Sequence, residues 1–159
     1  MRNKRRFIVW GIITVLIMLI IFFMSAKPAV DSQDQSDFVL DMLHSIGIAK
    51  GVTDSAVPFF WIISIRKIAH MLEYFALGFA MNIAVYNVRE FSNISTAVIS
   101  MVIAYLYSCT DEIHQVFVPG RAGMLSDTLI DLIGIVTAIL ILVIYRMIKN
   151  NNRAQIEKE

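Results

Sequence analysis

Apolar side chains fill four long stretches of the chain, and polar side chains gather between them. The first stretch, residues 7–24, carries no charge and only Thr14 as a polar side chain. A helix of this length nearly spans the hydrocarbon core of a bilayer, which is about 30 Å thick. Residues 68–88, 94–111 and 127–148 are also long and mainly apolar. The pattern therefore predicts an all-α fold, a bundle of four transmembrane helices.

The connection between the first two spans is long and is expected to form short helices at the membrane surface. Ser36 is suited to begin such a helix and Gly47 to end it. The aromatic residues 59–61, which follow Pro58, are typical of the lipid–water boundary and are expected in a surface loop. His44 is expected to be an exposed or interfacial side chain. A re-entrant or lid segment is the alternative.

Basic residues set the expected orientation. They precede the first span, as they also do in a cleavable secretory signal, but no Ala-x-Ala motif follows Met24 and the apolar run is long for a signal. An uncleaved span is therefore predicted. Nine of the 14 basic residues lie in the tails and in the short link between the second and third spans. The positive-inside rule then predicts a multi-pass plasma-membrane protein with both termini in the cytoplasm.

The composition excludes several classes of protein. Apolar residues make up 57% of the chain and charged residues 17%, and the mean hydropathy is +0.67, which argues against an ordinary soluble domain and against disorder. A net charge of +1 argues against a nucleic-acid partner. Cys109 is the single cysteine. The length fits one domain, residues 1–159, in which Gly78, Gly134 and Ala138 are expected to permit close helix packing.

Ionisable residues of the last three spans gather at one end of each span. In the second span they lie at the start, where Arg66, His70 and Glu73 share one helical face. In the fourth span Asp127 and Asp131 lie one turn apart at the start. Consecutive spans run in opposite directions, so these ends and the end of the third span lie on one side, outside the cytoplasm. The end of the third span contributes Ser108, Thr110, Asp111, Glu112, His114 and Gln115.

This polar cluster has two interpretations. A carboxylate in the apolar zone costs several kcal/mol unless it is paired, hydrated or metal-bound, which favours a functional site. In a purely structural network, by contrast, basic side chains would pair with the carboxylates and lock the helices together. Three basic residues then face five acidic ones, so pairing leaves negative charge that requires protons, water, a cation or a cationic substrate group. The residues counted are Arg66, Lys67 and Arg121 against Glu73, Asp111, Glu112, Asp127 and Asp131.

The spacing of His70 and Glu73 is compatible with two kinds of chemistry. Together with the other carboxylates and His114, they could hold a divalent metal ion. A carboxyl group beside a histidine could equally act as a general acid or base. No zinc signature such as H-E-x-x-H occurs in the sequence, so the sequence leaves the metal and any cofactor undetermined.

Two strings, RKIAHMLEYFALG and CTDEIHQVFVPGRAGMLSDTLIDLIG, resemble the VanZ-like family of bacterial membrane proteins. Its hallmarks are K-x-x-H-x-x-E-Y, D-E-x-x-Q-x-F-x-P-G-R and D-x-x-x-N-x-x-G. The resemblance covers roughly residues 10–145. The chain departs from the third motif at Asp131, which replaces Asn and adds a possible charge. The matching residues are Lys67, His70, Glu73, Tyr74, Asp111, Glu112, Gln115, Phe117, Pro119, Gly120, Arg121, Asp127 and Gly134.

The resemblance implies a four-span protein of the cell envelope, in a family whose founding member is associated with low-level teicoplanin resistance. It supplies no reaction. We expect an outward-facing polar pocket that binds or acts on an amphiphile, with membrane lipid, a lipid-linked cell-wall precursor or a lipoglycopeptide as partner. Candidate catalytic residues are His70, Glu73, Asp111, Glu112 and Asp127. Candidate substrate-binding residues are Lys67, Tyr74, Gln115, Arg121, which would reach an anionic headgroup, and Asp131.

Two other functions stay open at this point. The chain could be a membrane-embedded hydrolase or transferase, with or without assistance from a metal ion, that acts on a lipid-linked substrate. It could also be a non-catalytic protein that binds a partner through its spans, in which case changes in the polar pocket would be tolerated.

Overall fold

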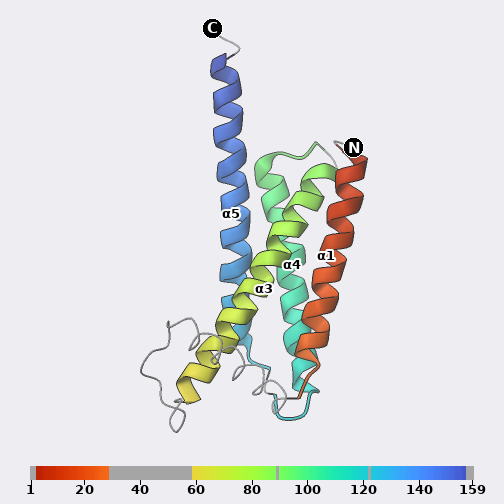
Figure 1. Cartoon of the computed structure of the whole chain (residues 1–159), viewed down its shortest axis with the longest axis vertical. Coiled ribbons are helices and arrows are strands. Elements are labelled where there is room, and N and C mark those ends of the chain that lie inside the picture. Colours follow the sequence, from red (N-terminus) through yellow and green to blue (C-terminus); the bar gives the residue numbers. More distant parts are fainter. Residues whose placement is uncertain (1–2, 29–58, 89, 122, 157–159) are drawn as a thin grey trace, which may run out of the picture.

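The computed structural model of the chain describes residues 3–28, 59–88, 90–121 and 123–156, and these residues form four helices (Figure 1). Each helix contains a segment long and apolar enough to cross a bilayer, which confirms the predicted all-α fold with four spans. The surface helices and His44, both predicted between the first two spans, lie outside the described residues. The helices are α1 (Lys4–Ser25), α3 (Phe59–Val88), α4 (Asn93–Val116) and α5 (Leu125–Ile156).

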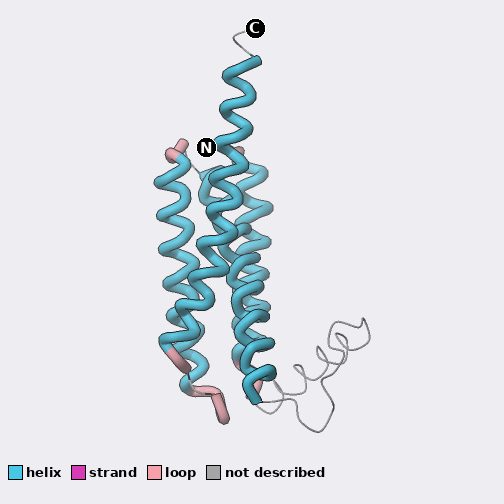
Figure 2. Tube along the Cα trace, turned by 90° about the vertical axis from the view of Figure 1, so that its left-hand side faces the viewer, coloured by secondary structure: helices cyan, strands magenta, loops and turns pink. Residues whose placement is uncertain are grey.

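The helices extend beyond the apolar stretches that predict them. Residues 59–61 form the first turn of α3, so the prediction of a surface loop there was wrong. Helix α4 continues to Val116, beyond the predicted boundary at residue 111. Helix α5 runs on to Ile156 and projects past the other helices (Figure 2). The reason is physical: hydropathy marks the part of a helix that fits the bilayer, whereas backbone hydrogen bonding continues into polar sequence.

The helices alternate in direction, and both chain ends lie at the same end of the bundle (Figure 1). Helix α3 packs against each of the other three helices, and α1 and α5 lie on opposite sides of it. The end at which α1 and α4 finish and α3 and α5 begin is called the polar end below. The other is called the opposite end.

The inside and the outside of the bundle are both apolar over its middle. A buried core forms where all four helices meet, from Ile21, Tyr74, Leu77, Ala104, Ile135 and Ile139. Large apolar side chains also cover the outer surface, among them Phe23 on α1, Leu106 on α4 and Ile133 on α5. Such a continuous exposed apolar surface is unfavourable in water and is expected of helices that face lipid.

Glycines bring α3 and α5 into close contact. A Cβ atom added at Gly78 would lie 3.0 Å from the Cα of Ile135, and one added at Gly134 would collide with the carbonyl oxygen of Met71. The two backbones therefore approach each other more closely than larger side chains would allow, as expected at membrane helix interfaces. This crossing fixes the rotation of α3 against α5, and with it the direction in which their polar side chains point.

The opposite end and the half of the bundle next to it contain a smaller set of polar contacts. The amide of Asn82 donates a hydrogen bond of 2.8 Å to the hydroxyl oxygen of Ser100, which links α3 to α4. The guanidinium group of Arg146 lies 3.8 Å above the ring of Tyr86. A cavity of about 340 Å³ lies beside the start of α1, lined by Asn3, Arg5, Arg6, Val9 and Trp10.

Candidate functional site

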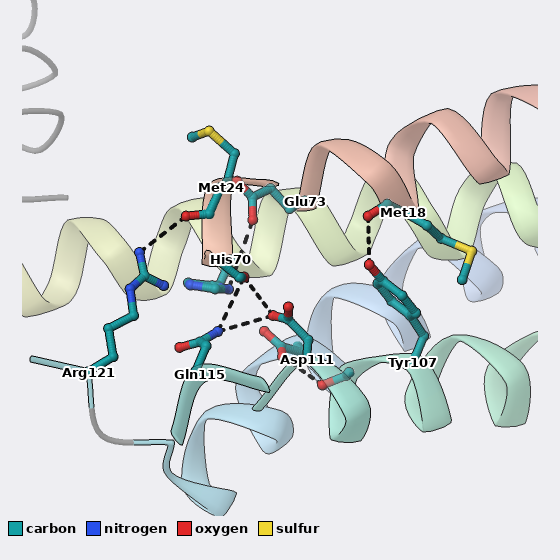
Figure 3. A network of polar contacts seen from close by, with 11 residues as sticks. Met18, Met24, His70, Glu73, Tyr107, Asp111, Gln115 and Arg121 are labelled. Carbon is teal, nitrogen blue, oxygen red and sulfur yellow. Dashed lines mark hydrogen bonds and ion pairs between the residues drawn. The ribbon is translucent and has the colours of Figure 1, made fainter. Parts of the chain in front are cut away.

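The polar end combines side chains from all four helices and from the loop between α4 and α5 (Figure 3). The arrangement follows from alternating helix directions: the last turns of α1 and α4 lie beside the first membrane-embedded turns of α3 and α5. The close crossing of α3 and α5 then turns the polar faces of these helices toward one another. The polar side chains are divided below into a buried floor and an accessible rim.

The buried floor is centred on Asp111 of α4, which is only 3% exposed. Its Oδ2 atom accepts a hydrogen bond of 2.8 Å from the hydroxyl group of Ser25 and one of 3.1 Å from the amide of Gln115. The Gln115 amide also donates a hydrogen bond of 3.3 Å to the Ser25 hydroxyl oxygen. Figure 3 draws the contacts of Gln115 as dashed lines. These contacts join the last turn of α1 to α4.

Asp131 of α5 is the second carboxylate of the floor and is 1% exposed. Its Oδ2 atom accepts a hydrogen bond of 2.7 Å from the hydroxyl group of Ser108, which links α5 to α4. Tyr74 of α3 is fully buried and interacts electrostatically with both Asp111 and Asp131. We define the floor as Tyr74, Asp111, Gln115 and Asp131.

The accessible rim consists of two pairs on α3 and α5. The Nζ atom of Lys67 lies 3.3 Å from Oδ1 of Asp127, and the side chains are 39% and 31% exposed. The Nδ1 atom of His70 lies 3.9 Å from Oε2 of Glu73, longer than a hydrogen bond, and these side chains are 21% and 25% exposed. The rim thus presents charged and imidazole groups that an external molecule can reach.

The loop after α4 closes over the polar end. Gly120 has a φ of 76°, in the left-handed region that favours glycine, and it follows Pro119 in the turn. The backbone N–H of Met124 donates a hydrogen bond of 2.9 Å to Oε2 of Glu112, so this buried carboxylate anchors the loop to α4. Glu112 therefore has a structural partner, although the sequence suggested a catalytic role.

Arg121 in this loop reaches toward α1. Its Nη2 atom donates a hydrogen bond of 3.3 Å to the carbonyl oxygen of Met24, one of the last carbonyl groups of the helix (Figure 3). A cation at a helix C-terminus interacts favourably with the helix dipole. Arg121 also interacts electrostatically with Glu73 and Glu112. Its predicted contact with an anionic headgroup stays a prediction.

Helix α1 is the contribution that the sequence analysis missed. Ser25 donates to Asp111, the Met18 carbonyl oxygen accepts a hydrogen bond of 2.6 Å from the Tyr107 hydroxyl, and Phe22 stacks on the ring of His114 at 4.7 Å between centroids. Only a weak indication of the role of Ser25 is present in the sequence. Ser25 is simply the first polar residue after the first span, and such residues are common at span ends.

One alternative left open by the sequence was a divalent metal ion held by the histidine and carboxylate side chains. The described parts of the chain contain no group of side chains suited to this. No three His, Cys, Asp or Glu side chains among them are grouped closely enough to hold a metal ion together. The carboxylates of Asp111 and Asp131 instead accept hydrogen bonds from hydroxyl and amide groups.

The predicted site residues therefore share one end of the bundle but differ in surroundings. The floor residues and Glu112 are buried, the rim residues are partly exposed, and Arg121 bridges to α1. Asp111 connects the groups electrostatically, because it interacts with Glu73, Glu112 and Asp131. The side chain of Arg66, which was expected on the same face, lies outside the described residues.

Four apolar helices around a polar end define the chain as a multi-pass helical membrane protein. Within this class the chain matches the VanZ/LLP1 family over residues 10–146, and it belongs to that family. The resemblance read from its motif residues is thereby confirmed. Neither the curated proteins nor the solved structures contain a match to this chain.

Proposed function

We propose that this protein binds an amphiphile in the outer leaflet of the plasma membrane through the polar end of its bundle. A lipid-linked cell-wall precursor or a lipid-tailed glycopeptide has the required chemistry, and binding of either would contribute to teicoplanin-type resistance. The observation that supports this function most is the accessible rim, where charged and imidazole side chains lie next to surface that faces lipid.

The rim suits a ligand with a polar head and an apolar tail. Ile68 and Leu72 on α3 and Leu129 on α5 are exposed large apolar residues within a turn or so of the rim. A ligand tail would lie along these side chains in the lipid, while its headgroup meets Lys67 and His70. Lys67 supplies a positive charge for an anionic group such as phosphate, and His70 with Glu73 supplies hydrogen-bond donors and acceptors.

Replacing His70 or Glu73 by alanine is expected to abolish the resistance that the intact protein confers. Each change removes a side chain that would contact the headgroup, and a hydrogen bond to a charged group contributes about 1.5–3 kcal/mol, roughly a 10- to 100-fold loss of affinity. Two measurements test this. The first is the teicoplanin susceptibility of cells whose only copy of the gene is supplied on an expression plasmid. The second is binding of a fluorescent lipoglycopeptide to the purified protein in nanodiscs.

Leu106→Ala is the control, because Leu106 is an exposed apolar residue of α4, a helix that carries no rim residue. It should retain both resistance and binding. The abundance of each variant in the membrane must equal that of the wild type. If the His70 and Glu73 variants retain resistance, or lose it only as their abundance falls, the rim is not a ligand site and the cluster is structural.

The predicted orientation has its own test. In a Cys109→Ser background, a cysteine at Phe117, which is highly exposed at the polar end, should react with a membrane-impermeant maleimide on intact cells. A cysteine at Glu90, which is exposed between α3 and α4 at the opposite end, should react only after permeabilisation. The reverse labelling pattern would place the polar end in the cytoplasm and would contradict the proposal of a ligand in the outer leaflet.

A further inference from the structure

The cavity beside the start of α1 lies at the opposite end of the bundle (Figure 1). Its volume of about 340 Å³ is at the lower end of the range for ligand sites and suits a headgroup better than a whole lipid. The length of α1 separates it from the polar end. An occupant here is therefore a second ligand, and its presence or absence leaves the amphiphile site proposed above unaffected. The cavity is lined by Asn3, Arg5, Arg6, Val9 and Trp10.

Helical spacing arranges the wall of this cavity. Arg5 and Val9 lie one turn apart on α1, and Arg6 and Trp10 lie one turn apart on the neighbouring ridge. Each ridge therefore carries a guanidinium group near the helix start and a largely apolar side chain one turn deeper in the bilayer. Charged and apolar groups are separated by depth, as they are in a phospholipid.

Contacts with α3 hold the wall in place. The indole ring of Trp10 packs edge-on against the ring of Phe79, with 6.0 Å between the centroids. The backbone N–H of Asn3 donates a hydrogen bond of 3.5 Å to the carbonyl oxygen of Asn87. The side-chain oxygen of Asn3 in turn accepts a hydrogen bond of 2.9 Å from the backbone N–H of Arg6. The packing of α1 against α3 thus pre-organises the lining.

The two arginines have no counter-charge in the part of the chain that the structure describes. No residue of that part forms an ion pair or a hydrogen bond with the guanidinium group of Arg5 or Arg6. The first turn of α1 contains no acidic residue, and Lys4 adds a third cation to it. Cations at the positive end of a helix dipole are unfavourable, so this arrangement favours a bound anion.

An exposed apolar stripe leads away from the cavity along α1. Val9, Ile12 and Leu16 follow one another at helical spacing, and all three are large apolar side chains on the outer surface. A molecule whose headgroup enters the cavity can lay an acyl chain along this stripe. A soluble anion would make no use of it, so the surface favours a lipid over free phosphate.

We propose that this cavity binds the headgroup of an anionic phospholipid from the leaflet that borders the opposite end. Arg5 and Arg6 would hold the phosphate, to which planar guanidinium groups donate paired hydrogen bonds. Val9 and Trp10 would contact the glycerol and the first acyl carbons. A zwitterionic headgroup fits less well, because it brings a cation of its own toward two arginines that lack an anion. The predicted orientation places this end in the cytoplasmic leaflet, whose surface is negative.

Quenching of Trp10 fluorescence by brominated lipid tests the site. The chain has two tryptophans, Trp10 and Trp61, so Trp61→Phe leaves Trp10 as the reporter. The full-length variant is placed in nanodiscs of phosphatidylcholine that contain increasing amounts of brominated phosphatidylglycerol. Half-maximal quenching should require a mole fraction about 10-fold lower than with brominated phosphatidylcholine, because charge-assisted hydrogen bonds select the anionic lipid.

Glycerol 3-phosphate separates the lipid from a soluble ligand of the same headgroup chemistry. Added at millimolar concentration and constant ionic strength, it should leave the quenching by brominated phosphatidylglycerol unchanged. Relief of the quenching would mean that a soluble phosphate ester fills the cavity, and the lipid would be the wrong occupant.

Variants of the lining distinguish a built site from diffuse attraction. Arg5→Gln and Arg6→Gln should each lower the preference for phosphatidylglycerol about 10-fold. Lys4→Gln is the matched control, because it removes the same charge from the same turn but does not line the cavity, and its effect should be much smaller. Val9→Phe should weaken binding by filling the cavity without a change of charge. Ile8→Phe, at an exposed position outside the cavity, should not.

Three results would overturn the proposal. The first is equal quenching of Trp10 by the two brominated lipids. The second is a loss of preference in Lys4→Gln as large as in the arginine variants, which would indicate diffuse attraction to a negative surface. The third is an equal effect of Val9→Phe and Ile8→Phe, which would show that the cavity is not where the lipid binds.

Discussion

Gly134→Ala is expected to destabilise the protein more than any other single-methyl change in the bundle. The added Cβ atom would collide with the carbonyl oxygen of Met71 and lie 3.1 Å from the backbone nitrogen of Phe75. Both neighbours are backbone atoms of α3, so no side chain can rotate to make room. Overpacking of this kind costs about 1–3 kcal/mol or more. The free energy of unfolding is measured by titrating the protein with SDS in mixed micelles.

Gly11→Ala is the control for this change. Gly11 lies in the interior of α1, and a Cβ atom there would meet no atom within 4 Å. Alanine also favours the helical conformation by about 1 kcal/mol over glycine, so this variant should be at least as stable as the wild type. Equal stability of the two variants would mean that α3 and α5 are not held in the close contact described above.

Ser25→Ala is expected to produce the second large effect. The change deletes the shortest hydrogen bond to the buried carboxylate of Asp111 and leaves Gln115 as its remaining donor among the bonds described above. Leaving a buried charged group under-satisfied costs about 1–3 kcal/mol or more. The loss should appear as a lower unfolding free energy, together with faster reaction of a cysteine placed in the last turn of α1 with a thiol reagent.

Tyr107→Phe provides the comparison, because it also removes one hydrogen bond between α4 and α1 but leaves no carboxylate exposed to an apolar environment. Its cost should be smaller, about 0.5–1.5 kcal/mol. A double-mutant cycle between Ser25→Ala and Asp111→Asn should show a coupling energy of similar size to the single effect. Additive effects, or a milder loss in Ser25→Ala than in Tyr107→Phe, would contradict the central place of the Ser25–Asp111 contact.

Much of the fold could be predicted from the sequence because a bilayer imposes a simple condition on length and polarity. Residues 7–24 are uncharged and long enough to span a bilayer, and the direction of each later helix followed by alternation. Helix ends were predicted less well. Glu112 and Gln115 looked like the end of a span, yet they continue α4 because their side chains find partners on the loop and on α1.

The location of the site could also be predicted, but its internal arrangement could not. Ionisable residues at the same end of three spans place the site, since burying them elsewhere would be costly. Which of them is buried depends on how each helix is rotated, and that is set by contacts such as the one at Gly134. Glu73 and Tyr74 are neighbours in sequence, yet one is a partly exposed rim residue and the other is fully enclosed.

The projecting end of α5 has a practical consequence. From Met147 to Ile156 the helix continues for about 15 Å, at 1.5 Å per residue, beyond the turn that carries Arg146. A fluorescent reporter joined to the carboxyl terminus would therefore sit on a stiff spacer, away from the lipid headgroups. Energy transfer from that reporter to dyes in the bilayer would be weaker than from one joined directly after residue 146.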